Sequence, residues 1–188
     1  MERTLVLLKP DAVSRGIVGN IISRFEQAGL KLIATKMVWP SRELADKHYP
    51  KDRREFIEGM GNKTLESYRE EGLDAKADFG AEEPHTIGLQ IQKWLVDFLV
   101  SGPVIALVLE GPDAIGLVRN ISGHTVPIKA DQGTIRGDHS DDSPAKANAE
   151  KRSIKNLVHA SGDQNEAEFE IGLWFSEDEL HSYDQEKV

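Results

Sequence analysis

The 188-residue sequence contains no cysteine, so disulfide bonds and thiolate chemistry are excluded. It also has no excess of basic residues, because 23 Lys and Arg stand against 32 Asp and Glu and the formal net charge is −9. A protein that holds nucleic-acid backbones needs a basic face that displaces counterions. Nucleic acid is therefore not an expected partner, and an anionic ligand must be held by a few local cations.

Long apolar runs are missing as well. The first apolar run, from Thr4 to Leu8, ends at Lys9 and is too short for a signal peptide or a membrane span. There is no GxxxxGKS/T motif, which excludes P-loop nucleotide binding. The chain is 39% hydrophobic and 29% charged, which is typical of a globular protein with one core. We expect a cytosolic protein with no membrane partner.

The spacing of apolar residues predicts strands that alternate with helices. The expected strands are 4–8, 30–39, 104–109 and 156–160, and the expected helices are 14–28, 41–49, 84–99, 113–120, 145–151 and 164–171. This order predicts an α+β fold with a ferredoxin-like βαββαβ antiparallel sheet, covered by helices on one face. We expect one further strand, whose position the pattern does not indicate.

Three segments have a weaker pattern. Residues 60–68 resemble a helical turn or two, and the acidic stretch from Gly72 to Glu83 is expected to be an exposed, mobile loop without a catalytic group. The helix from Pro84, by contrast, has a clear period, and its apolar stripe must be buried; the stripe consists of Ile87, Ile91, Trp94, Leu95 and Phe98. Residues 123–142 are rich in Gly, Pro, Thr and Asp and show no period. A loop of that length inside a compact domain is usually functional, so we expect a binding loop there.

Three cations lie where a phosphate could be held. Lys9 ends the first strand, while Arg119 and Arg136 lie in or beside the glycine-rich segment, where Thr125 and Thr134 supply hydroxyl groups. Guanidinium groups match phosphate oxygens, and an ammonium group adds a point charge. The alternative for Lys9 is an ordinary surface lysine, which composition alone favours.

Among six histidines, His159 is distinguished by its apolar neighbours in the expected last strand. A histidine in such a stretch is more often a core or edge residue than a nucleophile. A neutral imidazole can nevertheless attack phosphorus when an acceptor orients its second nitrogen. Glu170 is a candidate for that acceptor, but spacing alone does not establish the contact, and both interpretations stay open at this point.

A series of short motifs runs in order from residue 4 to about 180: Lys9-Pro10-Asp11, Arg15-Gly16-Ile17-Val18-Gly19, Arg24-Phe25-Glu26, His48-Tyr49, Ser101-Gly102-Pro103, Gly133-Thr134-Ile135-Arg136-Gly137-Asp138, Asn156-Leu157-Val158-His159-Ala160-Ser161 and Glu170-Ile171-Gly172-Leu173-Trp174-Phe175. Each motif is weak alone, but the motif at Gly133–Asp138 followed by the one at Asn156–Ser161 is a highly specific combination. Together they make the sequence similar to the nucleoside diphosphate kinase family.

The resemblance implies a ping-pong transfer of the γ-phosphoryl group from a nucleoside triphosphate to a nucleoside diphosphate through a phosphohistidine. It implies Mg²⁺ as cofactor, broad nucleotide specificity and a homo-oligomer. His159 matches the nucleophile, Glu170 matches the carboxylate on its second nitrogen, and Ser161 matches a nearby hydroxyl. Six further matches lie in the nucleotide site, and Phe56 is the nearest candidate for the aromatic that stacks on the base; the full set is Lys9, Tyr49, Phe56, Arg119, Thr125, Arg136 and Asn156.

The sequence departs from the family pattern at several points. Gly162 stands where the family commonly has an Asp that helps to hold the metal's water, so we expect Mg²⁺ to be held mainly by phosphates and waters. The chain reads as a single domain over 1–188 with an insertion at about 57–97, and residues 138–153 are also somewhat longer than in compact family members. Two rival functions are a regulatory module of ferredoxin-like fold that binds nucleotide without turnover, and a purely structural protein of that fold.

Overall fold

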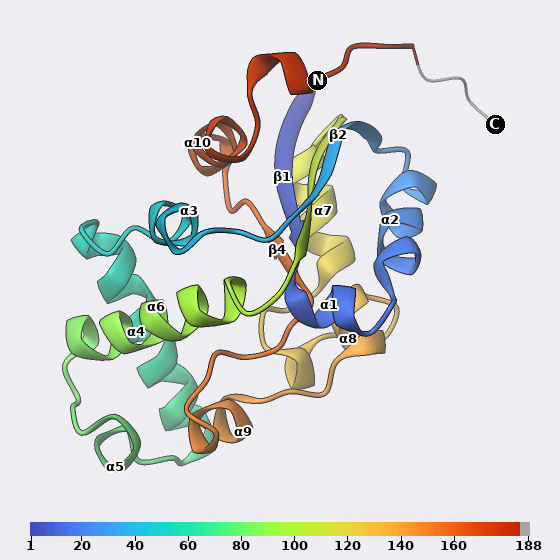
Figure 1. Ribbon diagram of the computed structural model, residues 1–188. Coiled ribbons are helices and arrows are strands. Elements are labelled where there is room, and N and C mark those ends of the chain that lie inside the picture. Colours follow the sequence, from blue (N-terminus) through green and yellow to red (C-terminus); the bar gives the residue numbers. More distant parts are fainter. Residues whose placement is uncertain (185–188) are drawn as a thin grey trace. The chain divides into compact units, whose positions relative to one another are not determined.

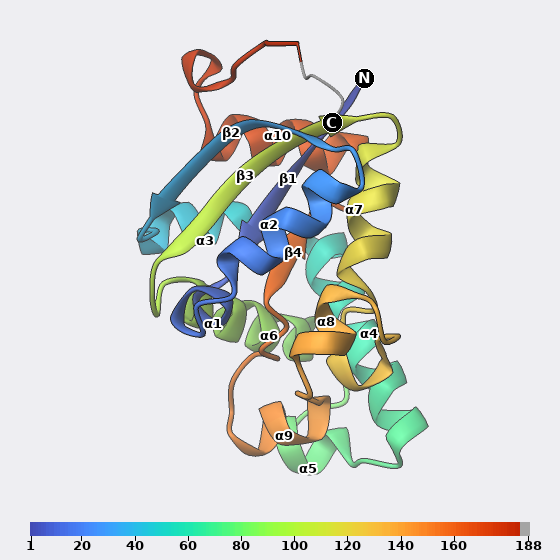
Figure 2. The same cartoon turned by 90° about the vertical axis from the view of Figure 1, so that its right-hand side faces the viewer.

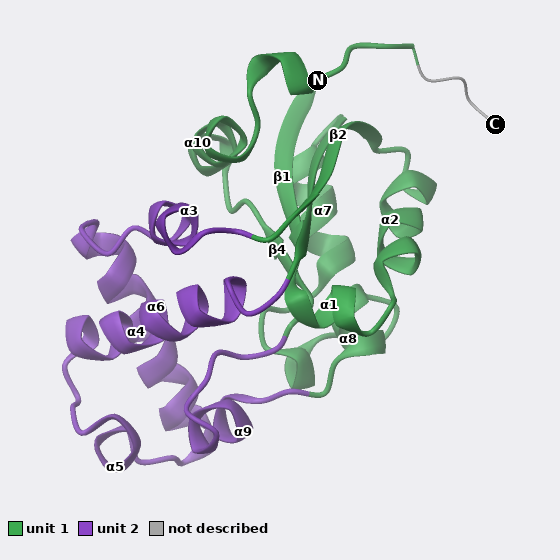
Figure 3. Ribbon diagram, viewed as in Figure 1, with its two compact units in different colours: residues 1–39, 103–141, 156–188 green, residues 40–102, 142–155 purple. Residues whose placement is uncertain are grey.

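The computed structural model describes residues 1–184 and divides the chain into two compact units (Figures 1 and 3). The first unit comprises residues 1–39, 103–141 and those from 156 onward. The second comprises residues 40–102 and 142–155.

A four-stranded antiparallel sheet forms the centre of the first unit. Its strands are β1 (Glu2–Leu8), β2 (Lys31–Val38), β3 (Val104–Gly111) and β4 (Val158–Ala160), in the order β2-β3-β1-β4. The α+β class and the βαββαβ order predicted from the sequence are confirmed. The further strand that we expected is not needed, because the four strands within residues 1–184 already complete that order.

Helices cover both faces of the sheet, whereas the sequence predicted only one. Val6 and Leu8 of β1 belong to a core with Phe25 of α2 (Val18–Gln27) and Val118 of α7 (Ala114–Ser122). The helix α10 (Gln164–Trp174) lies on the opposite face (Figures 1 and 2). The cause is that β1 is apolar on both faces, since residues 5–8 are all fully buried.

The segment 123–142 is more regular than the sequence predicted. Besides α1 (Pro10–Ser14) and η2 (Glu177–Glu179), the first unit contains η1 (Pro127–Lys129) and α8 (Ile135–His139) within that segment. Thr134 caps α8, because its Oγ1 accepts a hydrogen bond from the N–H of Gly137 at 3.1 Å. Asp138 accepts the N–H of Gly133 and pairs with Arg24 of α2, both within 2.8 Å. Local capping therefore orders a stretch that has no hydrophobic period.

The second unit is helical and consists of α3 (Arg42–His48), α4 (Arg54–Glu71), α5 (Ala75–Phe79), α6 (Pro84–Leu99) and α9 (Pro144–Ala149). Helices α4 and α6 approach closely through glycines. A Cβ at Gly61 would lie 1.8 Å from the carbonyl oxygen of Pro84, and one at Gly88 would lie 2.0 Å from that of Ile57. The longest helix, α4, has 18 residues, and none within residues 1–184 combines the length and apolarity needed to cross a bilayer.

The expectation of a loop from Gly72 to Glu83 is wrong, although most residues of the stretch are exposed as expected. This stretch contains α5, which Asp74 caps by accepting two main-chain N–H groups. Phe79 packs against Tyr68 with ring centroids 5.6 Å apart, in a small core that also includes Ile87. Only a few apolar residues in this acidic segment make the contacts, which is too few for a visible helical period.

Candidate active site

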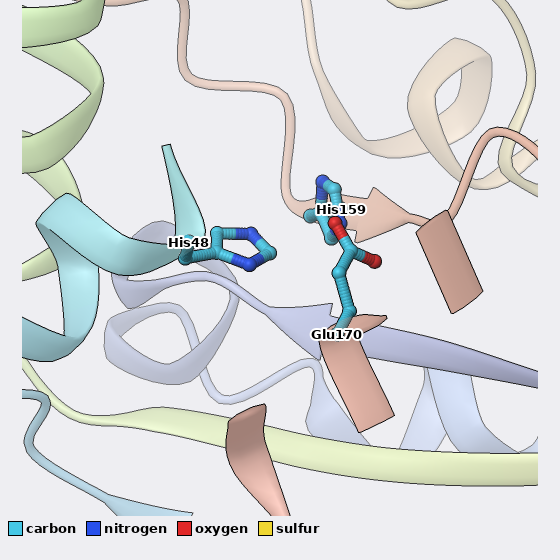
Figure 4. Close-up of side chains that lie close together, drawn as sticks. All are labelled: His48, His159 and Glu170. Carbon is cyan, nitrogen blue, oxygen red and sulfur yellow. The ribbon is translucent and has the colours of Figure 1, made fainter. Parts of the chain in front are cut away.

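His159 and Glu170 meet in the first unit. His159 lies opposite Leu7 in the β1–β4 ladder, so its side chain shares a face with Leu7. That face is the one covered by α10, which carries Glu170. The Nε2 atom of His159 lies 2.8 Å from Oε1 of Glu170, and the carboxylate is buried (Figure 4). The contact that spacing could not establish is therefore present.

Ser161 fixes the other oxygen of the Glu170 carboxylate. Its Oγ donates a hydrogen bond to Oε2 of Glu170 at 2.6 Å and accepts one from the N–H of Leu5 at 3.2 Å. Both carboxylate oxygens thus have defined partners, and the carboxylate is aimed at the imidazole. With Glu170 accepting the proton on Nε2, the lone pair of neutral His159 lies on Nδ1. A positive charge that develops on the ring is stabilised by the adjacent carboxylate.

Lys9 is a buried lysine, contrary to the surface alternative. Its Nζ donates to Oδ1 of Asn156 at 2.7 Å, and Nδ2 of Asn156 donates to the carbonyl oxygen of Thr125 at 2.8 Å. Burial, with a smaller contribution from the charge of Arg136, lowers the pKa of Lys9 to about 8. Hydrogen bonds therefore link Lys9, Asn156 and Thr125, all of which were predicted as site residues. They place a positive charge and hydrogen-bonding groups at the end of β1.

Arg136 is more deeply engaged with the main chain than a simple phosphate clamp requires. Its guanidinium donates to the carbonyl oxygens of Asn156, Gly123 and Val158 at 3.1, 2.6 and 2.6 Å. Burial and the nearby charge of Arg119 lower the pKa of Arg136 to about 10, so it remains a cation at neutral pH. These three bonds use three of its five N–H groups. Arg136 therefore braces the segment that leads to His159.

Arg119 and Glu166 lie beside Gly162. A Cβ at Gly162 would be 3.7 Å from Nη1 of Arg119, an exposed residue in the last turn of α7. Oε2 of Glu166 accepts the N–H of Gly162 at 2.8 Å, and it would lie 2.6 Å from that same Cβ. Glu166 was not among the residues predicted from the sequence. Its position three residues after Asp163, the N-cap of α10, is a helix-start spacing that could have indicated it.

Asp11 is a second residue to which the sequence assigned no role, although it belongs to the first motif. Its carboxylate is buried and accepts the N–H groups of Leu157 at 3.0 Å and Ala12 at 3.1 Å. The charge of this carboxylate partly offsets the lowering of the pKa of Lys9 and of Arg136. The Asp11 carboxylate therefore contacts the segment that leads to His159 and lies close to two cations of the site.

Tyr49 and Phe56 belong to the second unit, while the other eight predicted residues belong to the first. Tyr49 is buried at the end of α3, and its carbonyl oxygen accepts a hydrogen bond from Nε2 of Gln92 at 2.9 Å. Phe56 is half-buried near the start of α4. The structure brings together the residues around His159, Lys9 and Arg136 within one unit.

The fold and this site define an α+β protein in which a carboxylate-oriented histidine shares a unit with a buried lysine and two arginines. A model of the family described as nucleoside diphosphate kinase matches residues 2–64 and 86–180. The chain belongs to the nucleoside diphosphate kinase family.

Several relatives match nearly the whole chain. A nucleoside diphosphate kinase from Pyrobaculum aerophilum is 48% identical over 96% of this chain and 98% of its own length, and one from Archaeoglobus fulgidus is 39% identical over 98% and 93%. A crystal structure of the Pyrobaculum NDP kinase has a TM-score of 0.91 at 47% identity, covering 96% of this chain and 99% of that one. A transition-state mimic of the Borrelia burgdorferi enzyme, with bound vanadate and ADP, has a TM-score of 0.76 at 34% identity over 98% and 92%.

Proposed function

We propose that this chain transfers the γ-phosphoryl group of a nucleoside triphosphate to a nucleoside diphosphate by a ping-pong mechanism through a phosphohistidine at His159. The observation that carries the proposal is the 2.8 Å contact between Nε2 of His159 and Glu170, which leaves the lone pair on Nδ1. The relatives are named for this activity, and one was solved with vanadate and ADP. A regulatory module without turnover has no use for such an oriented histidine and is not favoured.

In the first half-reaction, Nδ1 of His159 attacks the γ-phosphorus and forms a P–N bond. The bond from that phosphorus to the oxygen bridging to the β-phosphate breaks, and the nucleoside diphosphate leaves with the bonding electrons. The proton on Nε2 stays on the ring, where Glu170 offsets the positive charge. In the second half-reaction, a terminal phosphate oxygen of another nucleoside diphosphate attacks the phosphorus and forms an O–P bond. The P–N bond breaks, its electron pair returns to Nδ1, and the neutral imidazole is restored with its proton still on Nε2.

The cations divide the work of binding. Arg119, Arg136 and the hydroxyl of Thr125 hold the phosphates, since the transferring group spreads negative charge over three oxygens. Lys9 and Asn156, which are hydrogen-bonded at 2.7 Å, hold the sugar hydroxyls and the bridging region. The family resemblance also implies nucleotide contacts for Tyr49 and Phe56. Stacking and sugar contacts do not distinguish one base from another, so we expect broad nucleotide specificity.

Mg²⁺ is part of the proposal, and the donor set beside Gly162 fits it. Mg²⁺ prefers oxygen ligands and keeps several waters. The carboxylate of Glu166, held by the N–H of Gly162 at 2.8 Å, supplies an oxygen where the family commonly has an Asp. Glu166 would receive a water of an ion held chiefly by the nucleotide's phosphates. When bound, Mg²⁺ neutralises charge on those phosphates.

A homo-oligomer in the cytosol completes the proposal. Met37 and Trp39 are 61% and 66% exposed at the end of β2, which is an edge strand of the sheet. Large exposed apolar side chains beside a sheet edge favour burial against another copy. A reducing compartment suits a chain without cysteine. Sedimentation of the purified protein tests the assembly, and a monomer at micromolar concentration would contradict it.

Radiolabelled ATP tests the phosphotransfer itself. Protein incubated with Mg²⁺ and ATP labelled at the γ-phosphate should gain an acid-labile label, and label at the α-phosphate should not be retained. ³¹P NMR should place the phosphoryl group on Nδ1, and addition of GDP should move the label to GTP. His159→Ala should abolish the label while ADP still binds. Label that persists in that variant would contradict the assignment, and no label in the wild-type protein would favour the regulatory module.

A further inference from the structure

Leu157, two residues before His159, has a backbone conformation that is rare for its residue type. Its φ is +69°, and the N–H of Val158 donates to the carbonyl oxygen of Asn156 at 2.7 Å, which closes a γ-turn with Leu157 at its centre. Within residues 1–184, the other non-glycine residues with positive φ are Asp113 and Lys151, and both are exposed, whereas Leu157 is fully buried. Such a turn is strained and persists only when its surroundings hold it.

Two groups that follow β1, the main chain of Lys9 and the side chain of Asp11 in α1, hold the peptide groups of Leu157. Oδ2 of Asp11 accepts the N–H of Leu157 at 3.0 Å, and the N–H of Lys9 donates to the Leu157 carbonyl oxygen at 2.8 Å. The second contact uses main chain that any residue would supply. The first depends on a side chain, and Pro10, at the first position of α1, fixes the backbone from which that side chain extends. Of these two contacts, the one made by Asp11 is therefore the one that a side-chain substitution can remove.

The turn decides how β4 begins. That strand has only three residues, pairs with β1 alone and places His159 at its centre. A short edge strand has few hydrogen bonds with which to correct its own direction. The direction in which the chain enters at Leu157 therefore affects whether the imidazole meets Glu170 at 2.8 Å.

We infer that Asp11 is a positioning residue, whose carboxylate holds the strained turn at Leu157 and thereby aims His159 at the phosphorus. The inference rests on the proposed phosphotransfer by His159. Asp11 acts as a hydrogen-bond acceptor in a fixed place. The competing account is that its negative charge alone matters, because it lies close to the cations Lys9 and Arg136.

Three substitutions separate position from charge. Asp11→Asn removes the charge but keeps one acceptor oxygen, which can face the N–H of Leu157 while the N–H₂ group lies on the side of Ala12. Asp11→Glu keeps the charge but moves it by one methylene, and Asp11→Ala removes both charge and acceptor. A positioning role predicts that Asn retains a single-turnover phosphorylation rate within about threefold of wild type, while Glu and Ala lose about 10- to 100-fold, or roughly 1.4–2.7 kcal/mol of barrier. A charge role predicts that Glu retains the rate and that Asn and Ala lose it equally.

The measurement is rapid-quench labelling from γ-labelled ATP, with ADP affinity by calorimetry beside it. ADP affinity should stay within about threefold in all folded variants, because Asp11 is assigned no contact with the nucleotide. Asp74→Ala is the matched control, since Asp74 likewise accepts two main-chain N–H groups at the start of a short helix. Its labelling rate should equal that of wild type.

The outcomes also separate this inference from the proposed function. If the wild-type protein gains no label, the phosphotransfer proposal fails before Asp11 is considered. If the wild-type protein is labelled and Asp11→Glu is as fast, the positioning role is overturned while the function stands. An Asp11→Ala variant that fails to fold leaves the Asn and Glu comparison, which decides the question without it.

Discussion

At the scale of single residues, the two ring nitrogens of His159 have different tasks, and Glu170 determines which one carries the proton. In Glu170→Gln the charge is lost, and an amide N–H₂ turned towards Nε2 would move the ring proton to Nδ1. Losing a charge-assisted hydrogen bond of about 1.5–3 kcal/mol should slow histidine phosphorylation by roughly 10- to 100-fold. Rapid-quench labelling measures this, with ADP affinity expected to be unchanged.

The matched control for Glu170→Gln lies two residues away on the same helix. Glu168 is exposed and bonds only Gln164 in its own helix among the contacts described for its side chain. Glu168→Gln should therefore label at the wild-type rate. Equal rates for the two variants would show that the carboxylate of Glu170 does not orient the reactive imidazole.

Lys9 gives the site a pH dependence with a definite sign. Its pKa is lowered from 10.5 to about 8, so between these values the folded protein has released a proton that the unfolded chain still holds. The free energy of unfolding therefore rises with pH across this window, by about 3 kcal/mol in all, and the full penalty of burying the charge applies below pH 8. Lys9→Met has no such group and should lack this rise.

Denaturant titrations at several pH values from 7 to 10.5 test the dependence on Lys9. Other groups titrate in the same window, but they are common to both proteins and cancel in the difference between wild type and Lys9→Met. That difference should shift in favour of wild type as the pH rises. A difference that stays flat would mean that Lys9 keeps an ordinary lysine pKa in the folded protein.

At the scale of elements, the sequence predicts those whose pattern is set by their own residues. The apolar runs of β1 and β3 and the bounds of α6 were predicted correctly within a few residues. The apolar stripe of α6 was predicted less well, because Ile87 is buried but Ile91, Trp94, Leu95 and Phe98 are half-buried, while Val96 and Leu99 are buried instead. Helix α5 was missed because only a few apolar side chains hold it, and its partners on α4 and α6 are distant in sequence. The prediction that helices cover only one face of the sheet was wrong for a similar reason. A continuous apolar strand does not show which helix covers its second face.

The same limit applies to the site. His159 can be predicted from its apolar neighbours and from the family motif. Its contact with Glu170, however, depends on the strand register that places His159 opposite Leu7. The strained turn at Leu157 also has no local signature, since leucine does not favour a positive φ. The turn is held by contacts of Lys9 and Asp11 with Leu157. These residues are distant in sequence and meet only in the folded chain.

Helix α5 gives an element-scale prediction. The ring of Phe79 stands 5.6 Å from that of Tyr68 and 5.7 Å from that of Trp94. Because the side chain is half-buried, Phe79→Ala should destabilise the second unit by about 1–3 kcal/mol. Denaturant unfolding followed by circular dichroism measures the change. Phe169→Ala, at a side chain that is 51% exposed on α10, is the control and should change stability by under about 0.5 kcal/mol.

At the scale of the whole molecule, the second unit is held together by its own hydrogen bonds and ion pairs. It is built from two stretches of chain, and the side chain of Asn148 donates to the hydroxyl of Tyr68, which in turn donates to Asp78 at 2.9 Å. Arg152 pairs with Asp142 at 2.5 Å within the shorter stretch. Burial and the bond to Asp78 raise the pKa of Tyr68, so its hydroxyl remains a donor at neutral pH. This network joins the two stretches.

The family match is interrupted from 65 to 85, which includes all of α5, and none of the predicted site residues lies there. We therefore expect residues 73–82 to stabilise the second unit and not to take part in chemistry. Their replacement by a short glycine linker removes Phe79 from its core but leaves the close contact between Gly88 and Ile57 that joins α4 and α6. Thermal unfolding should show lower stability, while histidine phosphorylation stays within about tenfold, or roughly 1.4 kcal/mol of barrier. A deletion variant that is folded by circular dichroism but gains no label would show instead that this segment completes the active site.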